Sequence, residues 1–254
     1  MNLGRPIGLT QLTTALEGGR LGELLAVPGC VRVSGVAWNP RSYVDALARV
    51  GPLVPTRSTH LNHPLREVFV VDGGLDVGAN WHADLVFCAE APRFSALLCE
   101  AAPQEGGETE LVDSRRCLEE LPPDLRALVR RVEGVFDGGL VQGRKLRRRG
   151  LVEEAERTET EAPLHVPLAR VHPESHRWGL RYHAEYLTGF VGLSPRDAAR
   201  LMEALRAVVD RPDLRYRHAW RPGDLLVFDN RAVLHRRAPG PIAGARRLLR
   251  VMMY

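Results

Sequence analysis

Short apolar or alternating runs, bounded by glycine, proline and aspartate, make up most of this chain. This pattern is typical of β-strands, in which successive side chains face opposite sides of a sheet. The runs that we expect to form strands are Cys30–Val36, Glu67–Asp72, Phe94–Glu100, Leu164–Val171, Leu214–Trp220, Leu225–Phe228 and Arg246–Met253. Turn segments rich in proline and glycine separate the last three of these runs.

Helical periodicity is confined to a few punctuated segments. One begins at the Asn39–Pro40 pair and ends at a glycine, in the order typical of a helix. A second region follows Asp113–Ser114, and Pro122–Pro123 divides it, so two short helices are expected there. The third begins at Ser194–Asp197, which resembles a capping box. Because strands do not alternate with helices, we expect a mainly β fold with flanking helices, a sandwich or barrel of jelly-roll type.

The stretch Asp137–Pro163 differs from the rest of the chain. It combines glycines, a basic cluster that includes Lys145, and five glutamates, with little apolar content. We expect it to carry no part of the core and to form either a lid or a solvated loop, inserted in a single domain that spans residues 1–254.

Composition narrows the class of protein. With 254 residues, 44% of them hydrophobic, the chain can bury one sizeable core. It has no apolar run of membrane-spanning length and no signal peptide, so we expect a cytoplasmic protein without membrane contact. The charge of +4 is spread over the whole length, and aromatic residues make up only 6%. A nucleic-acid partner is therefore not expected, a small-molecule substrate is, and a homo-oligomer stays open.

A candidate metal site lies in Asn80–Asp84. His82 and Asp84 are two residues apart at a predicted strand end, so their side chains face the same side. An imidazole nitrogen and a carboxylate oxygen on one face suit two adjacent coordination positions of a metal, with a third ligand arriving from elsewhere. The alternative interpretation is a hydrogen-bonded surface pair.

The C-terminal segment offers the missing partners. His235 lies on a late strand, Arg246 follows 11 residues later, and Arg250 is four residues further on. Arginine presents a fixed fork of donors that suits a carboxylate. These residues together suit a site that holds a metal beside a carboxylate-bearing cosubstrate, although each arginine could instead pair with a surface acid.

These motifs resemble the taurine dioxygenase (TauD/TfdA) family of iron(II)- and 2-oxoglutarate-dependent dioxygenases. The resemblance runs from about Glu67 to the C-terminus. The segments that carry it are Trp81–Asp84, Gly106–Thr109, Leu164–Pro173, Trp220–Asp224, Phe228–Arg231, His235, Arg246 and Arg250.

The resemblance implies a double-stranded β-helix (jelly roll) and a set of roles. His82, Asp84 and His235 would form the facial triad that binds Fe(II). Arg246 would pair with the distal carboxylate of 2-oxoglutarate, and Thr109 would donate a hydrogen bond to it. Dioxygen would be the second cosubstrate. Asp84 fills the position that halide occupies in related halogenases, so we expect oxygenation.

Substrate residues are harder to assign. The stretch before the triad departs from the taurine enzymes, with Gly78 near their asparagine, so a taurine specialist is not expected. The remaining candidates for substrate contact are His60, His63, Asn80, Tyr182, His183 and Arg250. Trp81 and Trp220 are expected in the core.

We expect the substrate to be small and anionic, such as an amino acid derivative, because Arg250 shares a face with Arg246. Hydroxylation of an aliphatic C–H bond, in natural-product biosynthesis, is the expected reaction. The alternatives are a catabolic sulfonate or carboxylate dioxygenase and a non-catalytic protein that binds 2-oxoglutarate or metal.

Overall fold

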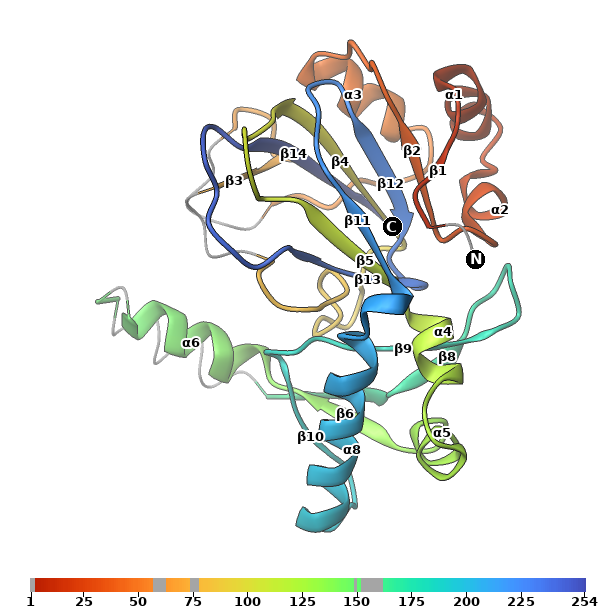
Figure 1. Ribbon diagram of the computed structural model, residues 1–254, viewed down its shortest axis with the longest axis vertical. Helices are drawn as coiled ribbons and strands as arrows, with labels where there is room; N and C mark the ends of the chain where they lie inside the picture. Colours follow the sequence, from red (N-terminus) through yellow and green to blue (C-terminus); the bar gives the residue numbers. More distant parts are fainter. Residues whose placement is uncertain (1–2, 57–62, 74–77, 149, 152–161) are drawn as a thin grey trace.

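The computed structural model describes residues 3–56, 63–73, 78–148, 150–151 and 162–254. Its largest element is a six-stranded sheet of order β1-β2-β12-β4-β14-β3. These strands are β1 (Arg5–Pro6), β2 (Cys30–Val33), β12 (Leu225–Asp229), β4 (Phe94–Ala101), β14 (Arg247–Met253) and β3 (Phe69–Asp72). A second sheet has the order β11-β5-β13, formed by β11 (Arg215–His218), β5 (Thr109–Asp113) and β13 (Val233–Arg237). Figure 1 shows the two sheets in the upper half of the molecule.

Alternation along the central strands buries both faces of the six-stranded sheet. Leu226 and Phe228 of β12 face the second sheet, whereas Leu225 and Val227 face the other way. The inner core lies between the two sheets and contains Cys30, Leu97, Cys99, Leu111, Trp220, Leu226, Phe228, Ala232, Val233 and Leu248. This double-sheet arrangement is the predicted jelly roll.

The outer core covers the opposite face of the six-stranded sheet. Three N-terminal helices pack there, namely α1 (Leu9–Glu17), α2 (Leu21–Leu25) and α3 (Pro40–Leu47). Buried leucines of α1 and α2 and Tyr43 of α3 contact the sheet residues. None of the helices in the described part of the chain is long and apolar enough to cross a membrane.

The lower core lies beneath the jelly roll, in the green and cyan part of Figure 1. Its strands are β6 (Glu133–Phe136), β7 (Leu164–Pro167) and β10 (Leu187–Phe190) in one sheet, and the hairpin β8 (Ala169–Val171) and β9 (Trp178–Leu180). Its helices are α4 (Ser114–Glu119), α5 (Pro123–Val129) and α8 (Pro195–Val209), with a 3-10 turn at Pro212–Leu214.

The capped helices occur where the sequence predicts them. The side chain of Asn39 accepts a hydrogen bond from the Ser42 backbone at the start of α3, and that of Ser194 accepts one from Asp197 at the start of α8. The prediction of one strand over Leu164–Val171 is wrong. The strand is interrupted at Leu168, and its two parts, β7 and β8, belong to different sheets.

The expectation that Asp137–Pro163 carries no core is wrong for its first part. Gly138–Arg148 form helix α6, which projects from the lower part of the molecule in Figure 1. Asp137 accepts a hydrogen bond from the Leu140 backbone at its start, and Val141 is buried in the lower core. Glycines in the segment masked this helix in the sequence. Residues 152–161 lie outside the described residues, so lid and loop remain predictions.

Candidate metal and carboxylate site

The His82–Asp84 segment extends the second sheet beyond β13. Its backbone exchanges two hydrogen bonds with His235, from His82 N to His235 O at 3.0 Å and from His235 N to His82 O at 2.8 Å. On its other side, Ala83 N donates to Tyr182 O at 3.0 Å. This antiparallel pairing brings His82 and His235 side by side, although they are far apart in the chain.

The same pairing brings the three ligand candidates together. His82 Nε2 lies 3.8 Å from Asp84 Oδ1, and His235 Nε2 lies 3.8 Å from Asp84 Oδ2. All three side chains are buried, and one ligand atom from each lies within 4.8 Å of the others. The structure thus confirms that these residues, which are far apart in the sequence, form one cluster.

The donor set fits a divalent cation. The carbonyl of Asn80 lies 2.8 Å from His82 Nδ1, and because a carbonyl can only accept, that nitrogen carries the proton and leaves the Nε2 lone pair available. His235 Nδ1 is buried without a hydrogen-bond partner among the described residues, and its Nε2 is too far from Asp84 for a hydrogen bond. Two imidazoles and a carboxylate at these separations match the 2-His-1-carboxylate set of non-haem iron sites.

Asp84 is held from two sides. The Ser95 hydroxyl donates to its Oδ2 at 2.7 Å, and Arg250 Nη1 donates to its Oδ1 at 2.8 Å. Its backbone is held by the Asn230 side chain, whose Oδ1 accepts from Asp84 N at 2.7 Å and whose Nδ2 donates to Asp84 O at 2.9 Å. The carboxylate is therefore fixed before any ligand binds.

Burial and charge set the protonation states of this cluster. Burial alone would raise the pKa of Asp84, but the Arg250 guanidinium, the two imidazoles and the Ser95 hydroxyl hold it well below its usual range. Burial lowers the pKa of His235 to about 3, and it also lowers the pKa of His82. At neutral pH the carboxylate is therefore ionised and the imidazoles are neutral, which are the ligating forms.

Arg246 is buried and forms no ion pair with an acid among the described residues. Arg246 Nε donates to Gly107 O at 2.7 Å, and Nη1 is buried with no hydrogen-bond partner among the described residues. Burial lowers the pKa of Arg246 to about 10, so it is still charged at neutral pH. A buried guanidinium needs an anion, and the planar fork suits a carboxylate.

The two glycines of the Gly106–Thr109 motif allow the Arg246 side chain and the Pro241 backbone to lie close to this segment. Gly107 has a φ of +69°, and a Cβ there would lie 2.8 Å from Arg246 Cδ. A Cβ on Gly106 would lie 2.1 Å from the Pro241 carbonyl oxygen. Any other residue would push the arginine away. Thr109, two residues after Gly107, is the first residue of β5, and its Oγ1 accepts a hydrogen bond from Trp220 Nε1 at 3.0 Å.

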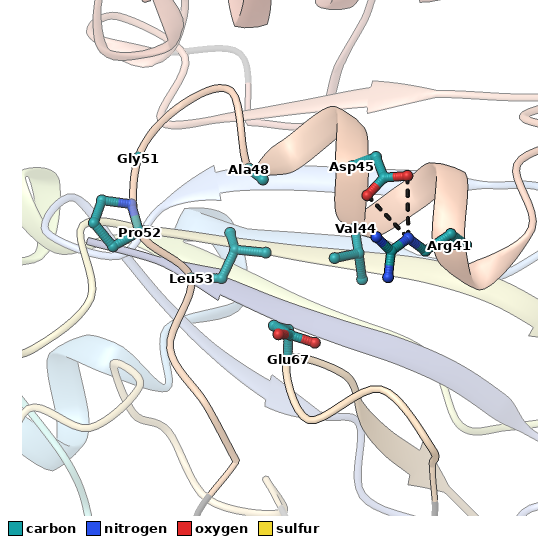
Figure 2. A pocket seen from close by; sticks show the side chains of 8 residues that line it. All are labelled: Arg41, Val44, Asp45, Ala48, Gly51, Pro52, Leu53 and Glu67. Atoms are coloured by element: carbon teal, nitrogen blue, oxygen red, sulfur yellow. Dashed lines mark hydrogen bonds and ion pairs between the residues drawn. The ribbon is translucent and has the colours of Figure 1, made fainter.

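Two hollows lie on the surface of the described part. One, of about 410 Å³, adjoins Arg246 and is lined by Asp72, Gly73, Ile242, Gly244, Ala245 and Arg246. The other, of about 440 Å³, lies beside α3, where Arg41 and Asp45 form an ion pair on its wall, as Figure 2 shows. Neither hollow is lined by a residue of the metal cluster, and only the first adjoins Arg246, the candidate carboxylate-binding residue.

The predicted substrate residues are divided by the structure. Arg250 pairs with Asp84 and lies over the Phe69 ring at 4.8 Å, so its charge is met inside the protein. The expectation of an anionic substrate depended on an unpaired Arg250 guanidinium, and the ion pair with Asp84 removes that argument. His63 accepts a hydrogen bond from the Leu65 backbone at 3.1 Å. Asn80 is exposed, and its backbone carbonyl accepts the hydrogen bond from His82. His60 lies outside the described residues.

Tyr182 as a substrate residue is wrong. Its side chain is 1% exposed and packs in the lower core, because successive residues of an extended segment face opposite sides. The next residue, His183, faces the metal cluster instead, with its ring centroid 5.2 Å from that of His82. Phe87 and Tyr186 stack on each other beside it, with centroids 3.9 Å apart. Trp81 and Trp220 are buried, as expected.

Sequence reasoning missed the side chains that support the ligands. Ser95 is a polar residue within the buried part of β4, whose other buried residues are apolar, and this contrast is visible in the sequence. The role of Asn230 was not assigned, although its motif was recognised. No local signal shows that the Asn80 carbonyl orients His82.

Comparisons with known proteins agree with this geometry. The family model "Taurine catabolism dioxygenase TauD, TfdA family" matches residues 4–253. An alpha-ketoglutarate-dependent 2,4-dichlorophenoxyacetate dioxygenase of Cupriavidus pinatubonensis is 32% identical over 174 residues, which are 67% of this chain but only 58% of that relative. Pentalenolactone F synthase of Streptomyces arenae is 28% identical over 217 residues, 76% of this chain and 72% of that protein.

A solved structure gives the same fold. A taurine dioxygenase from Burkholderia xenovorans superposes with a TM-score of 0.74 at 22% identity, covering the whole of this chain and 84% of that one. The likeness therefore extends over both sheets and the lower core.

Proposed function

This chain belongs to the TauD/TfdA family of dioxygenases, and on that premise we propose that it uses Fe(II), 2-oxoglutarate and dioxygen to oxidise a small molecule. One observation carries the proposal. A buried His-Asp-His cluster with available nitrogens lies in the same jelly roll as a buried arginine, Arg246, that has no acidic partner among the described residues. A metal ion and a carboxylate would satisfy both.

The residues divide the work between them. His82, Asp84 and His235 would hold Fe(II) on one side and leave its other positions for the 2-oxo acid and dioxygen. Arg246 and Thr109 would bind the distal carboxylate of 2-oxoglutarate. When bound, the iron and 2-oxoglutarate supply oxidising power by decarboxylation of the cosubstrate to succinate. The chain contributes position and the exclusion of water.

We propose an aromatic wall on the substrate side. His183, Phe87 and Tyr186 lie in contact next to His82, and Glu185 N donates to His183 Nδ1 at 3.3 Å. The proton of the neutral His183 ring is then on Nε2, which can donate to a substrate oxygen. Burial and the neighbouring His82 lower the pKa of His183 well below its ordinary value, so this neutral form persists at neutral pH.

The substrate we propose is a small anionic metabolite whose aliphatic C–H bond is hydroxylated. The name of the first relative, a 2,4-dichlorophenoxyacetate dioxygenase, supports a carboxylic acid. The name of the second, pentalenolactone F synthase, supports a role in natural-product biosynthesis, whereas the description of the family, which names taurine catabolism, favours the catabolic alternative.

Succinate release tests the proposal. The purified protein, loaded with Fe(II) under exclusion of air, is given 2-oxoglutarate and oxygen with a panel of aryloxyacetates, amino acid derivatives, alkyl sulfates and alkyl sulfonates. We expect one class of acid to stimulate succinate formation and to gain an oxygen atom, and we expect none of this with His235→Gln. Binding of iron and 2-oxoglutarate without stimulation by any compound would favour the non-catalytic alternative.

A further inference from the structure

The hydrogen bond between Trp220 and Thr109 has a fixed direction. Trp220 Nε1 lies 3.0 Å from Thr109 Oγ1, and both side chains are buried. An indole N–H can only donate, so the threonine oxygen must accept in this bond. The hydroxyl proton of Thr109 therefore cannot point at Trp220 and has to be donated elsewhere.

Among the residues that the structure describes, no acceptor is bound to that proton. The Trp220 bond is the one side-chain hydrogen bond that Thr109 makes with the described residues. Gly107, two residues earlier, accepts from Arg246 Nε, whose Nη1 has no partner in the described chain. The Thr109 hydroxyl and an N–H of Arg246 are thus both left as donors, and the Arg246 bond to Gly107 ties this guanidinium to the segment that carries Thr109. A carboxylate supplies two acceptors.

The indole is held firmly in place. Trp220 follows β11, whose last residue, His218, pairs with Thr109 across the sheet. The His218 ring meets the indole edge-on at 4.5 Å. The turn after Trp220 is closed by Asp224, whose backbone N donates to Arg221 O at 2.9 Å and whose carboxylate accepts from Arg221 N at 3.1 Å. These contacts fix the donor that faces Thr109.

We infer that Trp220 is a positioning residue for the cosubstrate, which acts through Thr109 by turning its hydroxyl proton toward the carboxylate. The inference rests on the proposed function. Without the indole, the hydroxyl is free to rotate, and binding must restrict it again. Trp220 is therefore more than a core residue, although it does not itself touch the cosubstrate.

A double-mutant cycle on 2-oxoglutarate binding tests this role. The dissociation constant is measured by calorimetry on Mn(II)-loaded protein for wild type, Trp220→Phe, Thr109→Val and the double variant. We expect Thr109→Val to weaken binding roughly tenfold or more, since a hydrogen bond to a charged group is lost, and Trp220→Phe to weaken it roughly threefold to tenfold. In the Thr109→Val background, Trp220→Phe should have almost no further effect.

A matched control is Trp38→Phe, the same change at a partly buried residue of the outer core, which should leave the dissociation constant unchanged. Equal binding by Trp220→Phe and wild type, or a full additive loss in the double variant, would overturn the inference while leaving the proposed function intact. If wild type itself does not bind 2-oxoglutarate, the proposed function fails and the inference fails with it.

The indole proton gives a second measurement that needs neither turnover nor a metal. In protein labelled with ¹⁵N-tryptophan, the Trp220 Nε1–H signal should move upfield in Thr109→Val and keep its position in Thr109→Ser, which retains the oxygen. An unchanged signal in Thr109→Val would show that the bond does not form in solution and would overturn the inference, even if Trp220→Phe fails to fold.

Discussion

In the described part of the chain, two clusters of histidine and carboxylate groups have the spacing of metal ligands, and only one of them is suited to a metal. The first is His82, Asp84 and His235, and the second is His172, Glu174 and Asp229. In each, the ligand atoms lie within 4.8 Å of one another. Residue types and separations therefore do not distinguish them.

The difference lies in which lone pairs are already used. In the second cluster, His172 Nε2 is 3.0 Å from Asp229 Oδ2, and His172 Nδ1 accepts from Ser175 N at 3.1 Å. Arg231 donates to both oxygens of Asp229 and to Glu174. Both ring nitrogens of His172 have a partner, whereas His235 Nδ1 has none among the described residues and His235 Nε2 lies 3.8 Å from Asp84 Oδ2, too far for a hydrogen bond. The second cluster is an internal salt-bridge network, and the first needs a cation.

The largest expected effect is loss of the metal. His235→Gln, or His82→Ala, should abolish Fe(II) binding, because two remaining ligands cannot hold the ion in place of three. His172→Gln should retain a full complement of iron per folded chain. Metal analysis after anaerobic loading and desalting measures this. Iron retained by His235→Gln and lost by His172→Gln would reverse the assignment of the two clusters.

The next effect is on stability and concerns the second cluster. Arg231→Gln leaves the buried Asp229 with fewer charged partners and should lower the free energy of unfolding by about 3 kcal/mol, measured by urea denaturation. Iron binding by the folded fraction should be unchanged.

The matched control for this change is Arg200→Gln. Arg200 pairs with Asp124 on the surface, where both side chains are more than half exposed, and an exposed pair contributes at most about 1 kcal/mol. If the two variants are equally stable, the second cluster is not a structural network.

A smaller effect should follow when the support of Asp84 is weakened. Ser95→Ala removes the hydroxyl that donates to Oδ2, and we expect roughly tenfold weaker Fe(II) binding, as for other partners of metal ligands. Ser42→Ala, at an exposed position of α3, is the control. An unchanged affinity in Ser95→Ala would mean that Arg250 and Asn230 position the carboxylate without it.

The smallest expected effect is a pH dependence of the metal-free protein. Burial lowers the pKa of His235 to about 3 in the folded chain, so between that value and its ordinary pKa the unfolded chain binds more protons. Stability should therefore fall as the pH falls, on the order of 1 kcal/mol between about pH 7 and about pH 6. Asp84 does not contribute in this range, since its carboxylate is ionised in both states.

Chemical denaturation at the two pH values measures this dependence. His235→Gln, which has no titrating ring, should reduce the slope, and the part that remains is expected from His82 and His183, whose pKa values are also lowered by burial. The same slope in the variant and in wild type would place the titration on other groups.

The sequence predicted the parts of the site that depend on local spacing. His82, Asp84 and His235 meet in one cluster, and Gly106 and Gly107 lie against Pro241 and Arg246, whereas the roles that the resemblance gives these residues stay predictions. The strand β12 was predicted over nearly its observed range. Its side chains face opposite sides with a period of two residues, and a shift of its register by one residue would exchange the two faces.

Tertiary partners could not be predicted in this way. Nothing local shows that Arg250 faces Asp84 rather than a substrate, since the two are joined only when β14 lies beside β4. Which of Tyr182 and His183 faces the metal cluster likewise depends on how their segment pairs with the His82 segment. Helix α6 was missed because its glycines and charges conceal the few contacts, such as Val141, that hold it.

Formation of the Fe(II)–2-oxoglutarate complex tests the central claim most directly. Under anaerobic conditions, addition of 2-oxoglutarate to the iron-loaded protein should produce a visible absorption band in wild type and in His172→Gln. The band should be absent in His235→Gln and should need far more 2-oxoglutarate in Arg246→Ala, which loses the buried guanidinium. No band in wild type, or one that persists in His235→Gln, would contradict the account.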